Sequence, residues 1–400
     1  MLRASEEFGG IFMKAILNGR VIVPDEQGDF HVLDQMAVLY DERIAEILSM
    51  EELQAAAGVT EVFDAAGGYV APGFLNVHVH GCLGRDTMDD DAGALPAISR
   101  CQASMGVTAY LPTTMTYDFS TICRALDHVR EAMKSSAGAA VLGCHMEGPF
   151  ICESHKGAQA AVHIVKADFD RIEPYKDIVR MITIAPEELD GDYRFVEKCQ
   201  AADIVVSIGH SDADYDTAME AIEQHGVKHI THLFNAMTGL HHRRPGIVGA
   251  ALDSEANCEL IADNIHVHPA AQRIVYQAKQ GRHIVLITDS MRACGLADGE
   301  SELGGQKVWV KGQLATLADG TIAGSVLTMD RAIHIFQQNT GAPLPQVIEM
   351  VTRTPAEELG IYAQQGSIEK GKQADFAIFD DDLKIAATIV RGKLVYEREC

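Results

Sequence analysis

Two histidines separated by one residue end an apolar stretch in the first quarter of the chain. The stretch covers residues 72–81 and contains His78 and His80. Side chains alternate across a β-strand, so both imidazoles would project from the same face. Two neighbouring imidazoles supply half of a divalent metal site. A bare His-x-His pair is more often solvent-facing or part of a core, so its meaning depends on how other strands end.

Further ionisable residues end several other apolar stretches. They are Glu147, His210, His232, His266 and Asp289. Some have an ordinary explanation, because His210 and Asp289 could begin helix-capping turns and His232 could be a core histidine. Buried ionisable groups without partners are costly, however, and a divalent cation is the simplest partner common to the whole set. The pattern therefore predicts a metal site.

Strand and helix patterns alternate through the middle of the chain and would position these residues. The expected strands are residues 73–80, 108–113, 140–147, 181–185, 204–210, 229–233, 258–263 and 284–289. The clearest helical patterns are residues 119–134, 193–202, 214–224 and 269–280. Near-continuous apolar strands are typical of parallel sheets covered on both faces. Eight such units predict an α/β fold, a (β/α)8 TIM-type barrel, whose chemistry lies at the C-terminal ends of its strands.

An open doubly wound sheet is the alternative architecture. It would need a glycine-rich phosphate turn after the first strand, and residues 81–84 match that turn poorly.

The two ends of the chain carry short strands and turns. Residues 13–68, with a short helix expected at 50–57, and residues 366–400 are each too short for a core of their own. We therefore expect them to form one small β-sandwich module. The module would flank a catalytic barrel at residues 69–365.

Composition limits the classes of partner. The 400 residues carry a formal net charge of −24, which argues against nucleic acid and anionic membranes. An anionic substrate would thus be held by local cations. Nine scattered cysteines without a Cys-x-x-Cys pair favour reduced thiols. No apolar run reaches membrane-spanning length and residues 1–12 do not resemble a signal peptide, so we expect a cytoplasmic protein.

Six motifs together resemble the amidohydrolase superfamily and, within it, the N-acetylglucosamine-6-phosphate deacetylase family. They are His-x-His-Gly (78–81), His-Met-Glu-Gly-Pro-Phe (145–150), Gly-His-Ser (209–211), Thr-His-Leu-Phe-Asn-Ala-Met (231–237), Ala-Asp-Asn-Ile-His (262–266) and Ile-Thr-Asp-Ser-Met (287–291). The resemblance extends from about Lys14 to Tyr396. Many amidohydrolases bridge two metals with a lysine of strand four. The expected fourth strand has no lysine, and these deacetylases use the strand-three glutamate instead.

The resemblance implies a metal-dependent deacetylase of amino sugar catabolism. Glu147, His210 and His232 would hold the main ion, Zn²⁺ or Fe²⁺, and His78 and His80 would hold a second with Glu147 bridging. One or two ions per subunit are thus expected. A metal-activated hydroxide would hydrolyse the acetamide of N-acetyl-D-glucosamine 6-phosphate to glucosamine 6-phosphate and acetate. Asp289 would be the general base and then the acid, assisted by His266.

The resemblance also implies a set of substrate-binding residues. They are Asn235, Ala236, Arg243, His266, Gln159 and Met329. Arg243 lies in the basic segment 241–244, which on composition alone could be a solvated turn. In the family the matching arginine reaches into the site of a neighbouring subunit, so a homodimer is expected. Gln159 stands where some members have histidine, and a Gly-Ser turn before a helix explains the Met329 segment equally well.

Three other functions remain open. N-acetylgalactosamine 6-phosphate differs from the expected substrate by one inverted hydroxyl. Another amidohydrolase, such as a D-aminoacylase, hydantoinase or dihydroorotase, is less consistent with the lysine-free fourth strand and the arginines before Pro245. An inactive barrel serving as a scaffold should have lost ligands that this chain retains.

Overall fold

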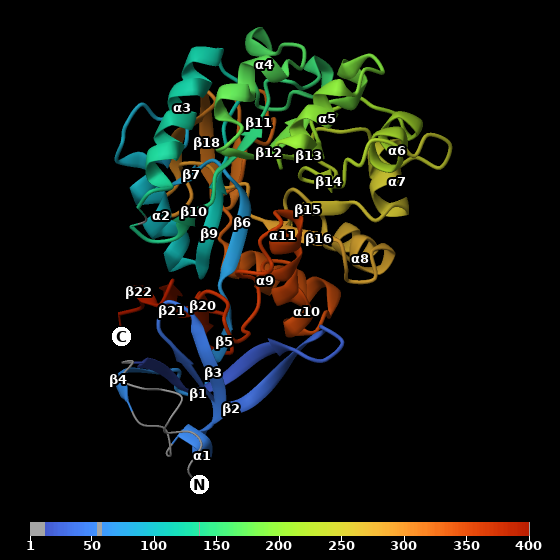
Figure 1. Cartoon of the computed structure of the whole chain (residues 1–400). Coiled ribbons are helices and arrows are strands. Elements are labelled where there is room, and N and C mark those ends of the chain that lie inside the picture. The colour runs from blue at the N-terminus through green and yellow to red at the C-terminus, as the bar shows by residue number, and fades with distance from the viewer. Residues whose placement is uncertain (1–12, 54–57, 136, 400) are drawn as a thin grey trace.

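The structure, a computed structural model, describes residues 13–53, 58–135 and 137–399. A helix-covered barrel stands above a smaller sheet, to which both ends of the chain contribute strands (Figure 1). The predicted (β/α)8 strands are all present. They are β6 (Phe74–Val79), β9 (Val107–Pro112), the consecutive segments β10 (Ala140–Val141) and β11 (Cys144–Glu147), β12 (Val179–Ile184), β13 (Val205–Ile208), β14 (His229–Ile230), β15 (Asn257–Ile261) and β16 (Ile284–Ile287).

Parallel pairing closes these strands into a barrel. Hydrogen bonds give the orders β10-β9-β6 and β11-β12-β13-β14-β15-β16. Parallel bridges join the two sets, one between Thr113 and His145 and the other between Val79 and Ser290. The C-terminal ends of all the strands therefore meet on one rim.

Helices cover the outside of the barrel (Figure 1). They are α2 (Ala94–Ser104), α3 (Phe119–Ala132), α4 (Phe169–Ile172), α5 (Arg194–Ala201), α6 (Tyr215–Glu223), α7 (Gly246–Asp253), α8 (Pro269–Ala278), α9 (Met329–Thr340), α10 (Leu344–Glu349) and α11 (Arg353–Glu358). Short 3-10 turns are η1 (Glu153–His155), η2 (Ala161–His163), η3 (Glu173–Tyr175) and η4 (Pro186–Leu189). In α3, Ile122, Leu126 and Val129 share the buried face, and Asp118 caps the first turn by accepting from the Thr121 N–H. None of the described helices is long and apolar enough to cross a membrane.

Both ends of the chain meet in one eight-stranded sheet below the barrel. Its strands are β1 (Met13–Pro24), β2 (Phe30–Tyr40), β3 (Ile44–Ser49), β4 (Val59–Asp64), β5 (Tyr69–Pro72), β20 (Phe376–Phe379), β21 (Ile385–Val390) and β22 (Lys393–Glu397). β5 falls in the range expected for the barrel but pairs with β1 and β20, and Gly73 alone separates it from β6. Of the helix expected at 50–57, α1 (Met50–Leu53) is present, and 54–57 lie outside the described residues. A sandwich arrangement stays a prediction.

Two small antiparallel sheets were not expected from the sequence. The first pairs β7 (Gly81–Cys82) with β8 (Arg85–Asp86). The second follows β16 and consists of β17 (Gly299–Leu303), β18 (Gln306–Lys311) and β19 (Leu314–Thr316). Gly304 and Gly305 both have positive φ in the two-residue turn between β17 and β18, a conformation that favours glycine. Leu303 at the end of β17 lines the cavity at the mouth of the barrel.

Candidate metal centre and catalytic site

Glu147, at the end of β11, contacts two imidazoles from neighbouring strand ends. Its Oε1 lies 3.2 Å from His210 Nε2 and 3.0 Å from His232 Nε2. The two imidazole nitrogens are 3.1 Å apart. One carboxylate oxygen and two ring nitrogens therefore converge within reach of a single ion.

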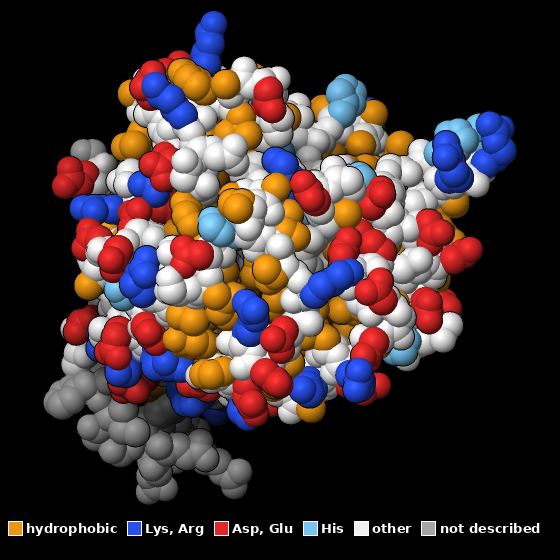
Figure 2. Space-filling model, turned by 90° about the horizontal axis from the view of Figure 1, so that it is seen from above, with side chains coloured by type: hydrophobic (Ala, Val, Ile, Leu, Met, Phe, Trp, Pro, Cys, Tyr) orange, Lys and Arg blue, Asp and Glu red, His pale blue; other side chains and the backbone are white. Residues whose placement is uncertain are grey.

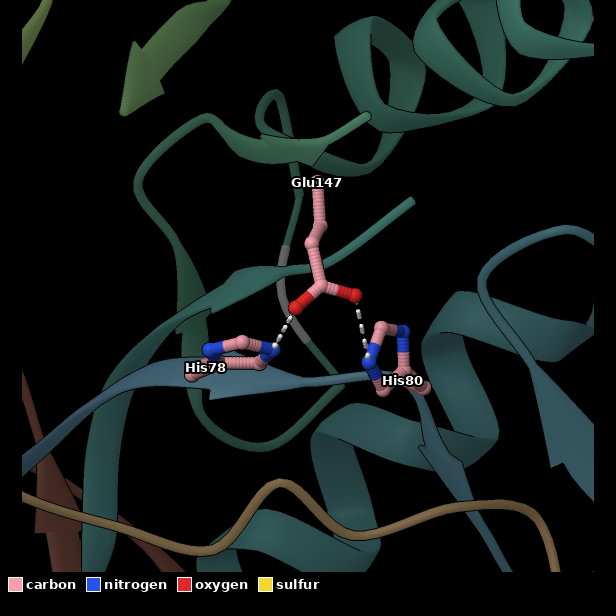
Figure 3. A group of neighbouring side chains, drawn as sticks. All are labelled: His78, His80 and Glu147. Carbon is pink, nitrogen blue, oxygen red and sulfur yellow. Dashed lines mark ion pairs between the residues drawn. The ribbon is translucent and has the colours of Figure 1, made fainter. Parts of the chain in front are cut away.

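A second group shares the same carboxylate. His78 on β6 and His80, directly after its end, project toward Glu147, as Figure 3 shows. His78 Nε2 lies 3.3 Å from Glu147 Oε1, and His80 Nε2 lies 3.5 Å from Glu147 Oε2. Glu147 thus lies between two sets of possible ligands, as a bridging carboxylate would.

Hydrogen bonds to the protein orient the rings. His80 Nδ1 lies 3.2 Å from the Thr113 carbonyl, His210 Nδ1 3.0 Å from that of His155, and His232 Nδ1 3.1 Å from that of Asn235. Each ring therefore presents Nε2 to the centre.

The residues fit a divalent metal by two further criteria. His78 Nε2 is a buried polar atom without a hydrogen-bond partner. The set of imidazoles and a carboxylate is the donor chemistry that zinc and ferrous iron take. A third grouping, His78 with His145 and Glu259, is less suitable, because the ring nitrogens of His145 already contact the Val77 carbonyl at 3.0 Å and Thr183 Oγ1 at 2.7 Å.

The backbone is strained at three of the strand ends that carry these groups. His210, His232 and Asp289 have φ angles of 48°, 30° and 47°, in the left-handed region that non-glycine residues rarely adopt. Such conformations cost about 1–3 kcal/mol each and concentrate at functional sites. The strain turns these side chains from the end of a strand into the mouth of the barrel.

Charge is concentrated in the centre. Burial raises the pKa of Glu147, but His210 and His78 outweigh burial and hold that pKa well below its usual range. Burial lowers the pKa of His78, and the carboxylates of Glu259, Glu147 and Asp289 more than offset it. The carboxylate of Glu147 is thus kept ionised, as a ligand must be.

Asp289 and His266 are two further ionisable residues at the candidate metal centre. Asp289 Oδ1 is 3.2 Å from His80 Nε2, and its pKa is lowered because His78 and His80 outweigh the effect of burial. His266 Nδ1 is 2.6 Å from Asp263 Oδ2. Burial lowers the pKa of His266, but Asp263 outweighs it and raises that pKa above its usual value.

These groups border a cavity of about 280 Å³. Of the residues predicted for the site, His80, Glu147, Gln159, His210, His232, Asn235, Ala236, His266 and Asp289 line it. His78 lies beneath, fully buried. Gln159 donates from Nε2 to Glu147 Oε2 at 2.6 Å and accepts the Thr116 N–H at 2.7 Å, so its amide orients the carboxylate.

Two predicted substrate residues lie elsewhere. Arg243 is exposed and lines a separate cavity of about 610 Å³ with Tyr215 and Pro245. In Figure 2, Lys or Arg and His side chains gather on a projection at the edge of the molecule, and residues 241–244 are all exposed. Met329 begins α9 and is fully buried in the core, so the cavity gives no support for its predicted substrate contact.

The sequence did not single out two carboxylates that hold site histidines. Asp263 contacts His266, and Glu259 contacts His78. Asp263 was visible in its motif only as a neighbour of His266. Glu259 is a lone charge inside the apolar strand β15, which is the signal that could have revealed it.

The barrel fold and the histidine and carboxylate groups at its mouth are typical of one class of hydrolase. The chain belongs to the amidohydrolase family, whose sequence profile matches residues 69–395. It is similar to N-acetylglucosamine-6-phosphate deacetylase of Bacillus subtilis (strain 168), with 38% identity over 345 residues, 84% of this chain and 87% of the relative. N-acetylgalactosamine-6-phosphate deacetylase of Escherichia coli O157:H7 is 36% identical over 331 residues, 81% of this chain and 87% of the relative.

A solved structure shares the whole fold. The crystal structure of N-acetylglucosamine-6-phosphate deacetylase from Pasteurella multocida matches with a TM-score of 0.90 and 28% identity. The match covers 97% of this chain and 100% of that one. The small sheet and the barrel therefore both have counterparts in that structure.

Proposed function

We propose that this chain hydrolyses the acetamide of N-acetyl-D-glucosamine 6-phosphate to glucosamine 6-phosphate and acetate. The observation that carries the proposal is the convergence of Glu147, four imidazoles and Asp289 at one small cavity. Curated relatives that match over most of their length carry the name of this activity, which supports the choice of substrate.

In this proposal Glu147, His210 and His232 would hold one divalent ion, Zn²⁺ or Fe²⁺. His78 and His80, together with Glu147, would hold a second. An ion bound there would lower the pKa of a water molecule toward about 7 and polarise the acetyl carbonyl.

The protein's own groups then move protons. Asp289 takes the proton of the attacking water and later delivers it to the departing amine, which is a poor leaving group until protonated. The lowered pKa of Asp289 keeps its carboxylate ionised, which is the form that can take a proton. His266, with Nδ1 held by Asp263, donates from Nε2 to the acetyl oxygen as negative charge develops there.

Substrate binding is proposed to involve the Asn235–Ala236 segment and Gln159, which line the cavity. Arg243 would bind the phosphate of a neighbouring subunit's substrate, which requires a homodimer. Its place outside this chain's cavity is consistent with that role.

Two further proposals concern the chain as a whole. The eight described cysteines are free, which supports a location in the reducing cytoplasm. The division predicted from the sequence is a module formed by 13–68 and 366–400 and a barrel of 69–365; we propose it with one change, because residues 69–72 (β5) pair within the sheet of the module.

N-acetylgalactosamine 6-phosphate is the second candidate substrate, because a relative of that name is nearly as similar. A hydantoinase or D-aminoacylase activity is less well supported, since β12 contains no lysine. An inactive scaffold is also disfavoured, since the predicted metal ligands are all present and converge.

The test is an acetate-release assay on protein loaded with Zn²⁺ or Fe²⁺. The panel holds N-acetylglucosamine and N-acetylgalactosamine, each with and without 6-phosphate, and an N-acetyl-D-amino acid. We expect the highest kcat/KM for N-acetylglucosamine 6-phosphate. Preference for the galactosamine epimer would select the second candidate, and release only from the amino acid would contradict the sugar assignment.

A further inference from the structure

Glu259 is a carboxylate with no exposed surface, placed in the middle of β15 between apolar neighbours. Its surroundings lie inside the barrel, beneath the cavity that the catalytic groups line. A buried carboxylate is costly unless its oxygens are paired. Its contacts therefore indicate why the chain retains it.

One oxygen of Glu259 serves both metal-capable groups. Oε2 lies 2.9 Å from His78 Nδ1, a ring of the β6 group. The same atom accepts the backbone N–H of His232 at 3.0 Å, and His232 belongs to the other group. A single atom thus contacts a member of each set.

The other oxygen faces away from the site. Oε1 lies 3.2 Å from His229 Nε2, and His229 Nδ1 is 3.9 Å from Glu358. This arm runs to His229 on the neighbouring strand β14 and to Glu358 on α11, and it touches no proposed ligand. Variants on the two sides of Glu259 can therefore distinguish an effect on the metal centre, through Oε2, from a structural ion pair, through Oε1.

His78 differs from its fellow ligands in how its ring is held. His80, His210 and His232 each direct Nδ1 to a backbone carbonyl. His78 directs Nδ1 to the carboxylate of Glu259 instead. Hydrogen bonds to an ionised acceptor are about twice as strong as neutral ones and increase the basicity of the distal nitrogen.

The backbone contact has its own consequence. His232 has a φ of 30°, and the hydrogen bond from its N–H to Glu259 helps to hold this strained conformation. Without that acceptor the backbone of His232 would be less constrained, and its ring would no longer be held toward Glu147.

We propose that Glu259 is a positioning residue that orients His78 through its ring and His232 through its backbone, and so sets the metal affinity of both groups. The inference rests on the proposed metal centre but not on the identity of the substrate. It assigns Glu259 no contact with the reacting atoms.

The experiment measures metal affinity without turnover. Apo protein is titrated with Zn²⁺ in competition with a chelating dye, for the wild type, Glu259→Gln and Glu259→Met. Gln can keep its carbonyl toward His78 and His232 but loses the charge, whereas Met fills similar volume and accepts neither hydrogen bond. We expect Kd for zinc to rise about 10-fold in Glu259→Gln and about 100-fold in Glu259→Met.

Glu358→Gln is the matched control, because it removes a charge at the far end of the outer arm. We expect its zinc Kd to equal that of the wild type, whatever happens to its Tm. Thermal unfolding of each apo protein separates lost stability from lost affinity. If Glu259→Met does not fold, the glutamine variant alone decides.

An unchanged zinc Kd in Glu259→Gln overturns the proposal, as does a loss of the same size in Glu358→Gln. Altered affinity in a protein that hydrolyses none of the panel would leave this inference standing and reject the proposed substrate. An unchanged zinc Kd in Glu259→Gln, together with hydrolysis of N-acetylglucosamine 6-phosphate by the wild type, would reject this inference and leave the proposed substrate standing.

Discussion

Glu147 is the residue at which the site is assembled, since both of its oxygens are in use. Oε1 faces His78, His210 and His232, and Oε2 faces His80 and accepts from Gln159. A carboxylate so surrounded by imidazoles stays ionised despite burial. All four of the candidate histidine ligands therefore contact one side chain at the end of β11.

Asp289→Asn tests the proposed base at this scale. The amide keeps the shape of the side chain but cannot take a proton, so we expect kcat to fall about 10²–10⁴-fold while metal content is unchanged. Metal is measured by elemental analysis and turnover by acetate release. Substantial activity in the variant would show that another group removes the proton.

Asp86→Asn is the control for this variant, because Asp86 is another buried aspartate and does not line the cavity. It should retain both metal and turnover. A comparable loss in Asp86→Asn would mean that changing any buried aspartate near the barrel impairs the enzyme.

The sequence revealed the residues that end strands and missed those that support them. Glu147, His210 and His232 stand in motifs at the close of apolar runs, so their convergence follows once the strands are parallel. Glu259 is 181 residues from His78 along the chain and lies within an apolar strand, so its local sequence does not indicate its partner. Met329 was predicted to contact substrate only through the family resemblance, and at the start of helix α9 its side chain is buried in the core.

At the scale of elements, the barrel strands were predictable because each is an apolar run that parallel neighbours cover on both faces. The β17–β19 sheet was not, since its strands are only three to six residues long and each buries only one or two of them. Its hairpin turn, Gly304–Gly305, was the available signal.

Gly209→Ala tests how tightly the end of β13 is packed. A Cβ at Gly209 would lie 2.6 Å from Thr231 Cβ and 2.9 Å from Thr183 Cγ2, closer than real side chains approach. We expect a loss of about 1–3 kcal/mol in the free energy of unfolding and weaker zinc binding through the adjacent His210. Denaturant unfolding and zinc titration provide the two measurements.

Gly239→Ala is the matched control, since a Cβ there meets nothing within 4 Å. Wild-type stability and zinc affinity in Gly209→Ala would mean that β13 and β14 separate easily, contrary to the tight packing described.

Asp375 gives the small sheet a pH-dependent stability. Burial raises the pKa of Asp375 to about 6, whereas it is about 4 in an unfolded chain. Between about pH 4 and pH 6 the folded state binds more protons than the unfolded state. The free energy of unfolding therefore falls as pH rises through this range, by a total of about 3 kcal/mol for this group. Asp375→Asn keeps an acceptor for the Arg391 N–H and should gain stability relative to the wild type from pH 4 to 7.

Asp380→Asn should behave in the opposite way, because hydrogen bonds and Arg398 outweigh burial and lower the pKa of Asp380. Its carboxylate contributes stability at neutral pH that is lost in acid. Urea unfolding of both variants at pH 4, 5, 6 and 7 checks the two signs. A constant difference between Asp375→Asn and the wild type across this range would contradict the raised pKa.

At the scale of the whole molecule, a net charge of −24 leaves phosphate binding to a few local cations. Arg243→Ala should therefore raise KM for N-acetylglucosamine 6-phosphate by about 10–100-fold and change KM for the free sugar little. Arg244→Ala, its exposed neighbour, is the control and should have a smaller effect. Equal losses for both sugars would remove the phosphate role of Arg243.

Mixed oligomers test whether Arg243 acts in the neighbouring subunit. When Arg243→Ala and Asp289→Asn chains are combined, one site of each mixed dimer regains both residues if the arginine acts in trans. Activity above that of either variant is the expected result. If the arginine serves its own chain, mixing restores nothing.

Gly73, the single residue between β5 and β6, has a consequence for the strand that carries His78 and His80. β5 is hydrogen-bonded on both sides within the lower sheet. Because only one residue follows it before β6, the register of β6 is fixed at its start. A slip of one position would turn both imidazoles out of the barrel together, because neighbouring residues of a strand face opposite ways. The terminal sheet, far from the cavity, thereby keeps His78 and His80 facing the other proposed ligands.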